Sequence, residues 1–296
     1  MDIASLIRLF TLAAIWGGSF LFMRIGAPVF GTGLLAELRV GIAALFLWGV
    51  CGWLGRRLNL RRHWRFYLVI GLLNSALPFL LFAYAAQTLS ASLMAILNSS
   101  SPIFGAIVAA IWLRQPVNRA AAVGLALGFA GVATLAWDGI ALNGDGGWPA
   151  LAASLGAALS YSIASSYTKR VQADVDPTDV AHGSMWAAAL LVSPFALLIP
   201  VPQIPISVDW LAAIVLGVLC TGVAYLLYFR LIKDVGPVRA LSVTFLIPVF
   251  GVALGVVFLD ETVGWKTLAG GALVLLGTAL VNGVLGGGRL LKAERS

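Results

Sequence analysis

The chain is poor in charged residues, cysteine and histidine. Asp, Glu, Lys and Arg together make up 10% of its 296 residues, and it contains two cysteines and two histidines. Both cysteines, Cys51 and Cys220, lie inside apolar runs, so we expect neither a disulfide framework nor a metal site. The sequence also lacks a His/Asp cluster and a Ser–His pair at a sensible depth. We therefore expect no cofactor, and we expect that the chain is not an enzyme.

Apolar residues are correspondingly abundant. They make up 60% of the chain, with a mean hydropathy of +0.98, which is more than a soluble domain of this length buries. The net charge of +7 does not indicate a nucleic-acid partner, because the basic residues stand between apolar runs and mark membrane topology instead. The first run resembles a signal peptide in length, but Arg24 closes it and further apolar runs follow, so we expect a retained helix. The composition predicts an all-α polytopic membrane protein.

The chain divides into ten apolar runs, each long enough at about 20 residues for a helix across the bilayer. The links between them are short, and the longest polar ones are 55–65 and 138–147. The ten predicted spans are 5–25, 33–54, 66–87, 91–113, 119–137, 148–169, 181–201, 209–231, 238–259 and 265–285.

Lysine and arginine concentrate in alternate links. Arginines crowd the link after the second span, and further basic residues flank the fourth, sixth and eighth spans and fill the tail: Arg114, Arg119, Lys169, Arg170, Arg230, Lys233, Arg239 and Arg289. The opposite links carry acidic residues, including Asp138, Asp145, Asp260 and Glu261. Because cytoplasmic links carry the excess of Lys and Arg, both termini are predicted to lie in the cytoplasm.

The second half of the chain repeats the first at a constant shift. Pro102 recurs as Pro248, and Gly124 recurs as Gly270, each 146 residues later. Because each half has an odd number of predicted spans, the second copy is inverted in the bilayer, as in many alternating-access carriers. We predict a first five-helix repeat at 1–137, an extracytoplasmic linker at 138–147, a second inverted repeat at 148–285 and a cytoplasmic tail at 286–296.

Polar and aromatic residues recur at matched depths within the two repeats. Near the middle of the third, fourth, eighth and ninth spans, and in the first and sixth, they form the candidate substrate-binding set: Trp16, Asn74, Phe79, Asn98, Ser101, Tyr161, Tyr225 and Thr244. Pro102 lacks an amide hydrogen and frees a carbonyl near Asn98, which suits a helix that faces a wet cavity. Two alternatives stay open: the polar side chains bond their own or neighbouring helices, and the aromatic ones only pack.

The acidic residues avoid the middle of every predicted span. Proton-coupled carriers usually keep a carboxylate there, so we expect transport without strong ion coupling. Glu37 and Arg39 lie near the outer end of the second span, and we favour a structural or interfacial role for Arg39 over substrate contact. A site without fixed charge then suits a net-neutral solute, such as a zwitterion.

Several motifs carry a resemblance to a known family. They are Trp16-Gly17-Gly18-Ser19 with Arg24, Glu37-Leu38-Arg39, Pro102, and Pro248 followed by Leu259-Asp260-Glu261. With the repeat, they make the chain similar over nearly its whole length to the EamA branch of the drug/metabolite transporter superfamily, and within it to YddG-type bacterial amino-acid exporters. Gln115 departs from the pattern, since the first repeat often has an acid there.

The resemblance implies a basket of helices around a central cavity and export of amino acids, aromatic ones included, across the bacterial inner membrane. The expected partners are thus small-molecule substrates, namely amino acids, and membrane lipid. The alternatives are an exporter of another metabolite or drug, with proton coupling through His182 as an option, a lipid-modifying enzyme, and a scaffold without transport. The oligomeric state stays open, with a monomer as one option.

Overall fold

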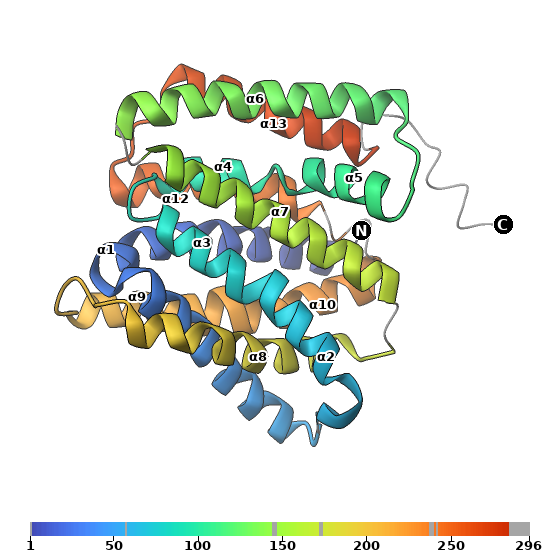
Figure 1. Cartoon of the computed structure of the whole chain (residues 1–296), viewed down its shortest axis with the longest axis vertical. Helices are drawn as coiled ribbons and strands as arrows, with labels where there is room; N and C mark the ends of the chain where they lie inside the picture. The colour runs from blue at the N-terminus through green and yellow to red at the C-terminus, as the bar shows by residue number, and fades with distance from the viewer. Residues whose placement is uncertain are drawn as a thin grey trace.

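The computed structural model describes residues 2–56, 58–143, 147–171, 174–236, 240 and 242–283. The tail 286–296, part of the linker, and the predicted topology markers Arg57, Asp145 and Arg239 lie outside these ranges. Every regular element in the described part is helical (Figure 1). The helices are α1 (Ile3–Trp53), α2 (Leu60–Gly71), α3 (Leu77–Ala85), α4 (Ala91–Asn98), α5 (Ser101–Trp112), α6 (Arg119–Asn143), α7 (Gly147–Val171), α8 (Pro177–Leu198), α9 (Ser207–Gly217), α10 (Ala224–Val235), α12 (Val243–Leu259) and α13 (Trp265–Val281), with π-helical turns η1 (Leu72–Ala76) and η3 (Val218–Val223).

Six helical stretches in the described ranges are both long and apolar enough to cross a membrane. One of them, α1, has 51 residues and turns at Gly31, whose φ of 72° only glycine adopts without strain, so it contains the first two predicted spans. The helices α12 and α13 are apolar but have 17 residues each. These lengths fit a polytopic membrane protein.

Both long polar links that the sequence predicts are partly helical. The arginine-rich link 55–65 is helical from Leu60, because the side chain of Asn59 accepts a hydrogen bond from the Arg62 amide and begins α2 there. The polar link 138–147 is helical as far as Asn143. Polar composition marks where a helix leaves an apolar environment, but the hydrogen bonds of the helix backbone can continue beyond that point. The predicted start at 238 lies outside the described residues, within which α12 begins at Val243.

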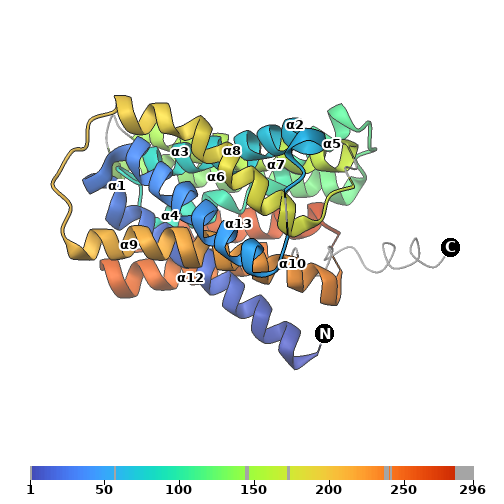
Figure 2. The ribbon, with the colours of Figure 1, turned by 90° about the horizontal axis from the view of Figure 1, so that it is seen from below.

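The two ends of the molecule are built from different links. The start of α1, the α5–α6 link and the end of α10 lie at one end, on the right in Figures 1 and 2. The α8–α9 link and the α12–α13 link lie at the other. The first end carries the basic links that the sequence predicts to be cytoplasmic, and we call it the basic end.

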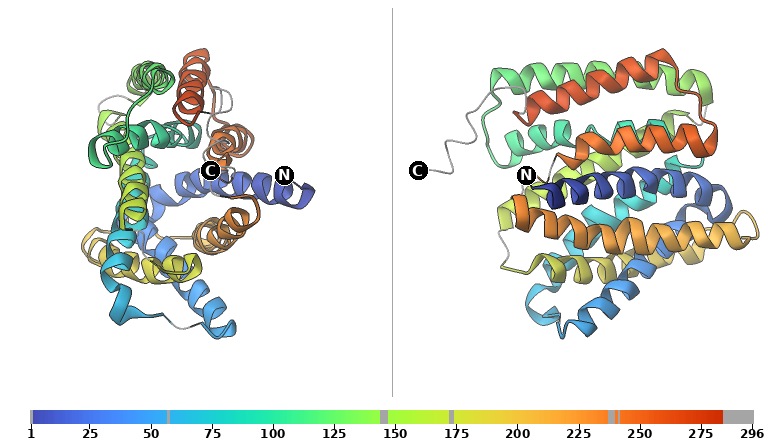
Figure 3. Two further views of the ribbon diagram at one scale, coloured as in Figure 1. Left: turned by 90° about the vertical axis from the view of Figure 1, so that its right-hand side faces the viewer. Right: turned by 180° about the vertical axis from the view of Figure 1, so that it is seen from behind.

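The helices α6 and α13 form a pair along one side of the molecule (Figure 3, right). Gly124 lies against the carbonyl of Gly277, and Gly131 lies against the carbonyl of Gly270. The helices are therefore antiparallel, with backbones in close contact at both crossings. The contact is also reciprocal, because Gly124 and Gly270 are repeat counterparts, as are Gly131 and Gly277. A two-fold relation between like helices produces this pattern.

We expect Gly277→Ala to destabilise the protein by about 1–3 kcal/mol. A β-carbon at Gly277 would lie 2.5 Å from the carbonyl oxygen of Gly124 and 2.7 Å from the amide nitrogen of Gly128, and neither backbone can yield freely. Thermal unfolding of the purified protein in detergent measures the loss. Gly49→Ala is the control, because a β-carbon there meets nothing within 4 Å. Equal unfolding temperatures for the two variants would contradict this packing.

Candidate solute-binding cavity

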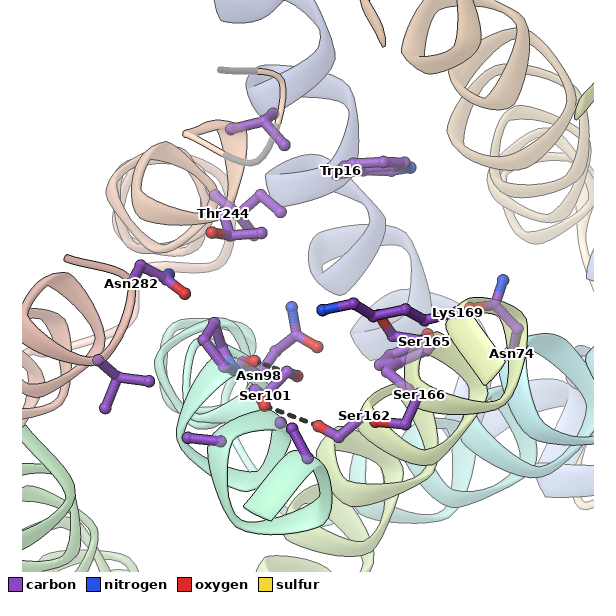
Figure 4. Close-up of a pocket in the computed structure, with 18 of the residues that line it drawn as sticks. Trp16, Asn74, Asn98, Ser101, Ser162, Ser165, Ser166, Lys169, Thr244 and Asn282 are labelled. Atoms are coloured by element: carbon purple, nitrogen blue, oxygen red, sulfur yellow. Dashed lines mark hydrogen bonds between the residues drawn. The ribbon is translucent and has the colours of Figure 1, made fainter. Parts of the chain in front are cut away.

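A cavity of about 610 Å³ lies between the two halves of the chain. All eight residues that the sequence singles out line it, from α1, η1, α3, α4, α5, α7, α10 and α12: Trp16, Asn74, Phe79, Asn98, Ser101, Tyr161, Tyr225 and Thr244. Figure 4 shows five of them, Trp16, Asn74, Asn98, Ser101 and Thr244, around the same space. The repeat pattern thus selects residues that the fold brings together from positions up to 228 apart in sequence.

Asn98 and Ser101 lie on either side of a break in the helix. We expect them on one helix face, but α4 ends at Asn98 and α5 begins at Ser101, ahead of Pro102. The hydroxyl of Ser101 donates to the carbonyl of Asn98 at 2.7 Å, which satisfies a backbone group at the break. The side-chain amide of Asn98 has no hydrogen-bond partner in the described part of the chain and points into the cavity (Figure 4). It is therefore available to a solute.

Asn74 lies in the π-helical turn η1, and its amide donates to the Tyr225 hydroxyl at 2.8 Å. The π turn ends at Ala76, two residues before Pro78 in the first turn of α3. The second π turn, η3, begins 146 residues later, at the repeat counterpart of Leu72, although the chain has no proline at the matching position. Proline alone thus does not explain the turn. In both copies the π turn directs a residue, Asn74 or Cys220, to the cavity.

Aromatic rings form much of the wall. The ring of Trp16 lies 5.2 Å from that of Tyr228, centroid to centroid, and Phe82 lies 6.4 Å from Tyr161. Phe79 is nearly buried and carries the guanidinium of Arg39 above its ring. Such a wall suits an apolar or aromatic side chain next to a small number of polar groups.

Two of the described residues that line the cavity are cations, and this corrects the expectation of an uncharged site. Arg39 lies at depth and is 6% exposed, and Lys169 lies near the basic end, where Figure 4 shows it reaching across the cavity. The sequence favours a structural role for Arg39, because composition and spacing do not reveal which way a side chain points. None of the lining residues that the structure describes is acidic.

Serines on α7 are a further set that the sequence analysis missed. Ser162, Ser165 and Ser166 line the cavity opposite the Asn98 break. Ser162 donates to the carbonyl of Ser101 at 2.6 Å and so joins α7 to the start of α5. Their spacing along one face of the predicted sixth span was the available signal.

The cavity reaches the surface at the basic end. Its lining includes the α5–α6 link from Leu113 to Asn118 and the last turns of α7 and α13, at Lys169 and Asn282. His182 does not belong to the lining residues: it is buried on α8 and accepts a hydrogen bond from the Trp186 indole at 3.1 Å.

Two charged side chains bind backbone groups at the opposite end. Glu261 accepts hydrogen bonds from the amides of Ala91 and Ser92, at 2.6 and 3.0 Å, and from the Ser92 hydroxyl, so its carboxylate caps the first turn of α4. Arg24 donates to the carbonyls of Ala86 and Gln87 just after α3. These contacts tie α1, α3, α4 and the α12–α13 link together. A separate cleft of about 400 Å³ lies outside them and is lined by both Arg24 and Glu261.

The sequence profile of the EamA-like transporter family matches the chain twice, at residues 4–137 and 148–283. The chain belongs to the EamA-like transporter family. This EamA protein is therefore a transporter and not an enzyme, as the sequence predicts, and its membership of the drug/metabolite transporter superfamily is confirmed.

Relatives and a solved structure agree with the assignment. The EamA protein is 26% identical over 280 residues to the uncharacterized transporter YvbV of Bacillus subtilis, covering 92% of the chain and 89% of the relative. It is 24% identical over 270 residues to a probable terminal-alkyne amino-acid exporter of Streptantibioticus cattleyicolor, covering 90% and 89%. One crystal structure matches with a TM-score of 0.67 and 21% identity over 100% of both chains, which supports the fold alone.

Proposed function

We propose that the EamA protein exports neutral and aromatic amino acids across the bacterial inner membrane, by alternating access and without strong ion coupling. The observation that carries the proposal is the cavity, which both halves of the chain line with aromatic walls and an unpartnered amide at Asn98. A cavity of this size and lining suits a small solute. One relative is named as a probable amino-acid exporter, and this favours amino acids as the solutes of this chain.

The proposal includes ten spans in two inverted repeats, 1–137 and 148–285, joined by the linker 138–147 and followed by the cytoplasmic tail 286–296. Three findings support it. The family profile matches each half separately, the π turns η1 and η3 begin 146 residues apart, and the glycine contacts between α6 and α13 are reciprocal. A basic end at the cytoplasm follows from the positive-inside rule.

Alternating access requires one end to be open while the other is closed. Glu261 and Arg24 hold together the end opposite the basic end, which we call the acidic end, while the cavity is open at the basic end. Their repeat counterparts, Gln115 and Lys169, both line the open cavity. We infer that the chain is in an inward-open state, and that these two side chains approach the ends of α10 and α12 when the basic end closes.

The absence of carboxylates from the cavity lining favours transport without proton coupling. The alternative is an exporter of another metabolite or drug that couples to protons through His182. The separation of His182 from the cavity gives that alternative no support.

Counterflow in proteoliposomes tests the function. Vesicles with purified protein and internal unlabelled phenylalanine or threonine should accumulate the labelled amino acid, at a rate that does not change when a pH gradient is collapsed. Protein-free vesicles control for leakage. Failure of every amino acid to exchange would remove the substrate assignment, and loss of exchange without a pH gradient would remove the facilitative mechanism.

We expect Trp16→Ala to weaken phenylalanine transport about tenfold and threonine transport less than threefold. The Trp16 ring packs at a tilt against Tyr228 on the cavity wall, and its removal takes away contact area that only a large side chain uses. Competition of each amino acid against counterflow gives both affinities. Trp48→Ala on the same helix is the control, because Trp48 is 63% exposed and does not line the cavity. Equal losses for both amino acids would contradict a side-chain wall at Trp16.

A further inference from the structure

Arg39 is a buried cation without an anionic partner. Its Nε donates to the Thr221 hydroxyl at 3.1 Å, its Nη1 lies 3.2 Å from the Met23 sulfur, and its Cζ lies 3.6 Å from the centre of the Phe79 ring. Its side chain forms no ion pair with any carboxylate in the described part of the chain. Glu37 lies two positions away on the same helix, and such residues point to different faces.

These contacts leave much of the guanidinium unsatisfied. A guanidinium has five N–H donors, whereas Thr221 accepts one and a thioether sulfur is a weak acceptor. The aromatic face of Phe79 stabilises the cation and fixes its plane, but it accepts none of the lateral N–H groups as a carboxylate would. A buried cation with unpaired N–H donors costs free energy unless an anion accepts hydrogen bonds from them.

The cavity supplies the place for that anion. Arg39 belongs to its lining, and the second charged group there, Lys169, is also a cation. Because no lining residue is acidic, the field in the cavity is positive from the basic end to Arg39. Such a field attracts anionic groups and repels organic cations that lack a carboxylate.

We propose that Arg39 binds the carboxylate of the transported solute through paired N–H···O hydrogen bonds. The planar fork of a guanidinium matches the two oxygens of a carboxylate, which a lysine in the same place does not reproduce. The proposal rests on the proposed function and narrows it: the solutes carry a carboxylate, and aromatic amines without one are excluded. Arg39 thereby determines specificity, while the aromatic wall accepts the side chain.

Matched pairs of compounds test this directly. Phenylalanine and phenylalaninamide differ in the carboxylate, and so do 3-phenylpropionate and 3-phenylpropionamide, which lack the amino group. Dissociation constants are measured by ligand-dependent thermal stabilisation of the purified full-length protein. We expect each carboxylate to bind at least tenfold more tightly than its amide. Measurable binding with equal affinity for the two members of either pair overturns the role of Arg39 and needs no variant, and so does a lack of stabilisation by all four compounds.

Variants of Arg39 test whether this residue causes the preference for a carboxylate over an amide. Arg39→Gln is expected to bring the affinity ratio of phenylalanine to phenylalaninamide close to one, and Arg39→Lys to leave it at a third or less of the wild-type ratio. Lys233→Gln is the control, because Lys233 is an exposed cation on α10 that does not line the cavity, and it should keep the wild-type ratio within about twofold. Because the ratio compares two ligands on one preparation, it does not depend on the folded yield. A wild-type ratio in folded Arg39→Gln or Arg39→Lys protein overturns the proposal.

The same data separate this inference from the proposed function. If 3-phenylpropionate binds tightly and phenylalanine does not, the carboxylate site stands and the amino-acid assignment fails. If phenylalanine and its amide bind equally well and exchange in vesicles, the transport function stands and the role of Arg39 fails.

Discussion

Replacement of Asn98 by alanine should lower the initial rate of amino-acid counterflow about tenfold or more, while the free energy of unfolding changes by less than about 0.5 kcal/mol. The side-chain amide points into the cavity and forms no hydrogen bond in the described part of the chain, so its removal breaks no contact within the protein. In the variant, a solute that hydrogen-bonds to this amide in the wild type loses about 1–3 kcal/mol of binding free energy. Counterflow rates and thermal unfolding on the same preparation measure both quantities.

Ser99→Ala is the matched control for this variant. The Ser99 hydroxyl donates to the Ala95 carbonyl within α4, and the residue does not line the cavity. We expect its transport rate to stay within about twofold of the wild type. A stable fold with normal flux in Asn98→Ala would contradict the role of the amide, and so would normal flux with a large loss of stability.

Replacement of Glu261 by glutamine should open the acidic end. The carboxylate accepts three hydrogen bonds at the start of α4, two of them from backbone amides, and a neutral amide offers one oxygen and no charge. A loss of about 1–3 kcal/mol raises the population of the state open at that end by roughly fivefold or more. The rate at which a cavity cysteine reacts with an impermeant thiol reagent added from the extracytoplasmic side reports this population.

Asp260→Asn provides the control for Glu261→Gln. Asp260 precedes Glu261, has a left-handed backbone that asparagine also tolerates, and is not a partner of α4 in the described contacts. Its replacement should leave the reaction rate unchanged. Equal rates for Glu261→Gln and the wild type would show that this cap does not hold the end closed.

Internal repetition made much of the cavity predictable. The constant shift between the two halves of the sequence pairs Phe79 with Tyr225 and Asn98 with Thr244. Because paired residues lie at a similar depth, all four line the same cavity. The helices also follow from the apolar runs, because about 20 consecutive apolar residues allow few other structures.

The remaining features depend on contacts that no local pattern encodes. Glu261 caps a helix that begins 170 residues earlier, so neither sequence neighbourhood reveals the bond. The sequence places Arg39 near the outer end of its span, but position along an apolar helix does not specify where a side chain points. Only its packing on Phe79 shows that Arg39 faces the cavity. The break between Asn98 and Ser101 was also hidden, since proline predicts a disturbed helix without fixing where the backbone departs.

The central claim is an amino-acid cavity that opens at the basic, cytoplasmic end. The most direct measurement places a single cysteine at Ser165, an exposed residue of the cavity wall, and follows its reaction with an impermeant thiol reagent in vesicles of known orientation. We expect reaction from the cytoplasmic side, slowed at least fivefold by saturating phenylalanine but not by phenethylamine, its analogue without a carboxylate. Reaction only from the opposite side, or a rate that phenylalanine does not change, would contradict the account.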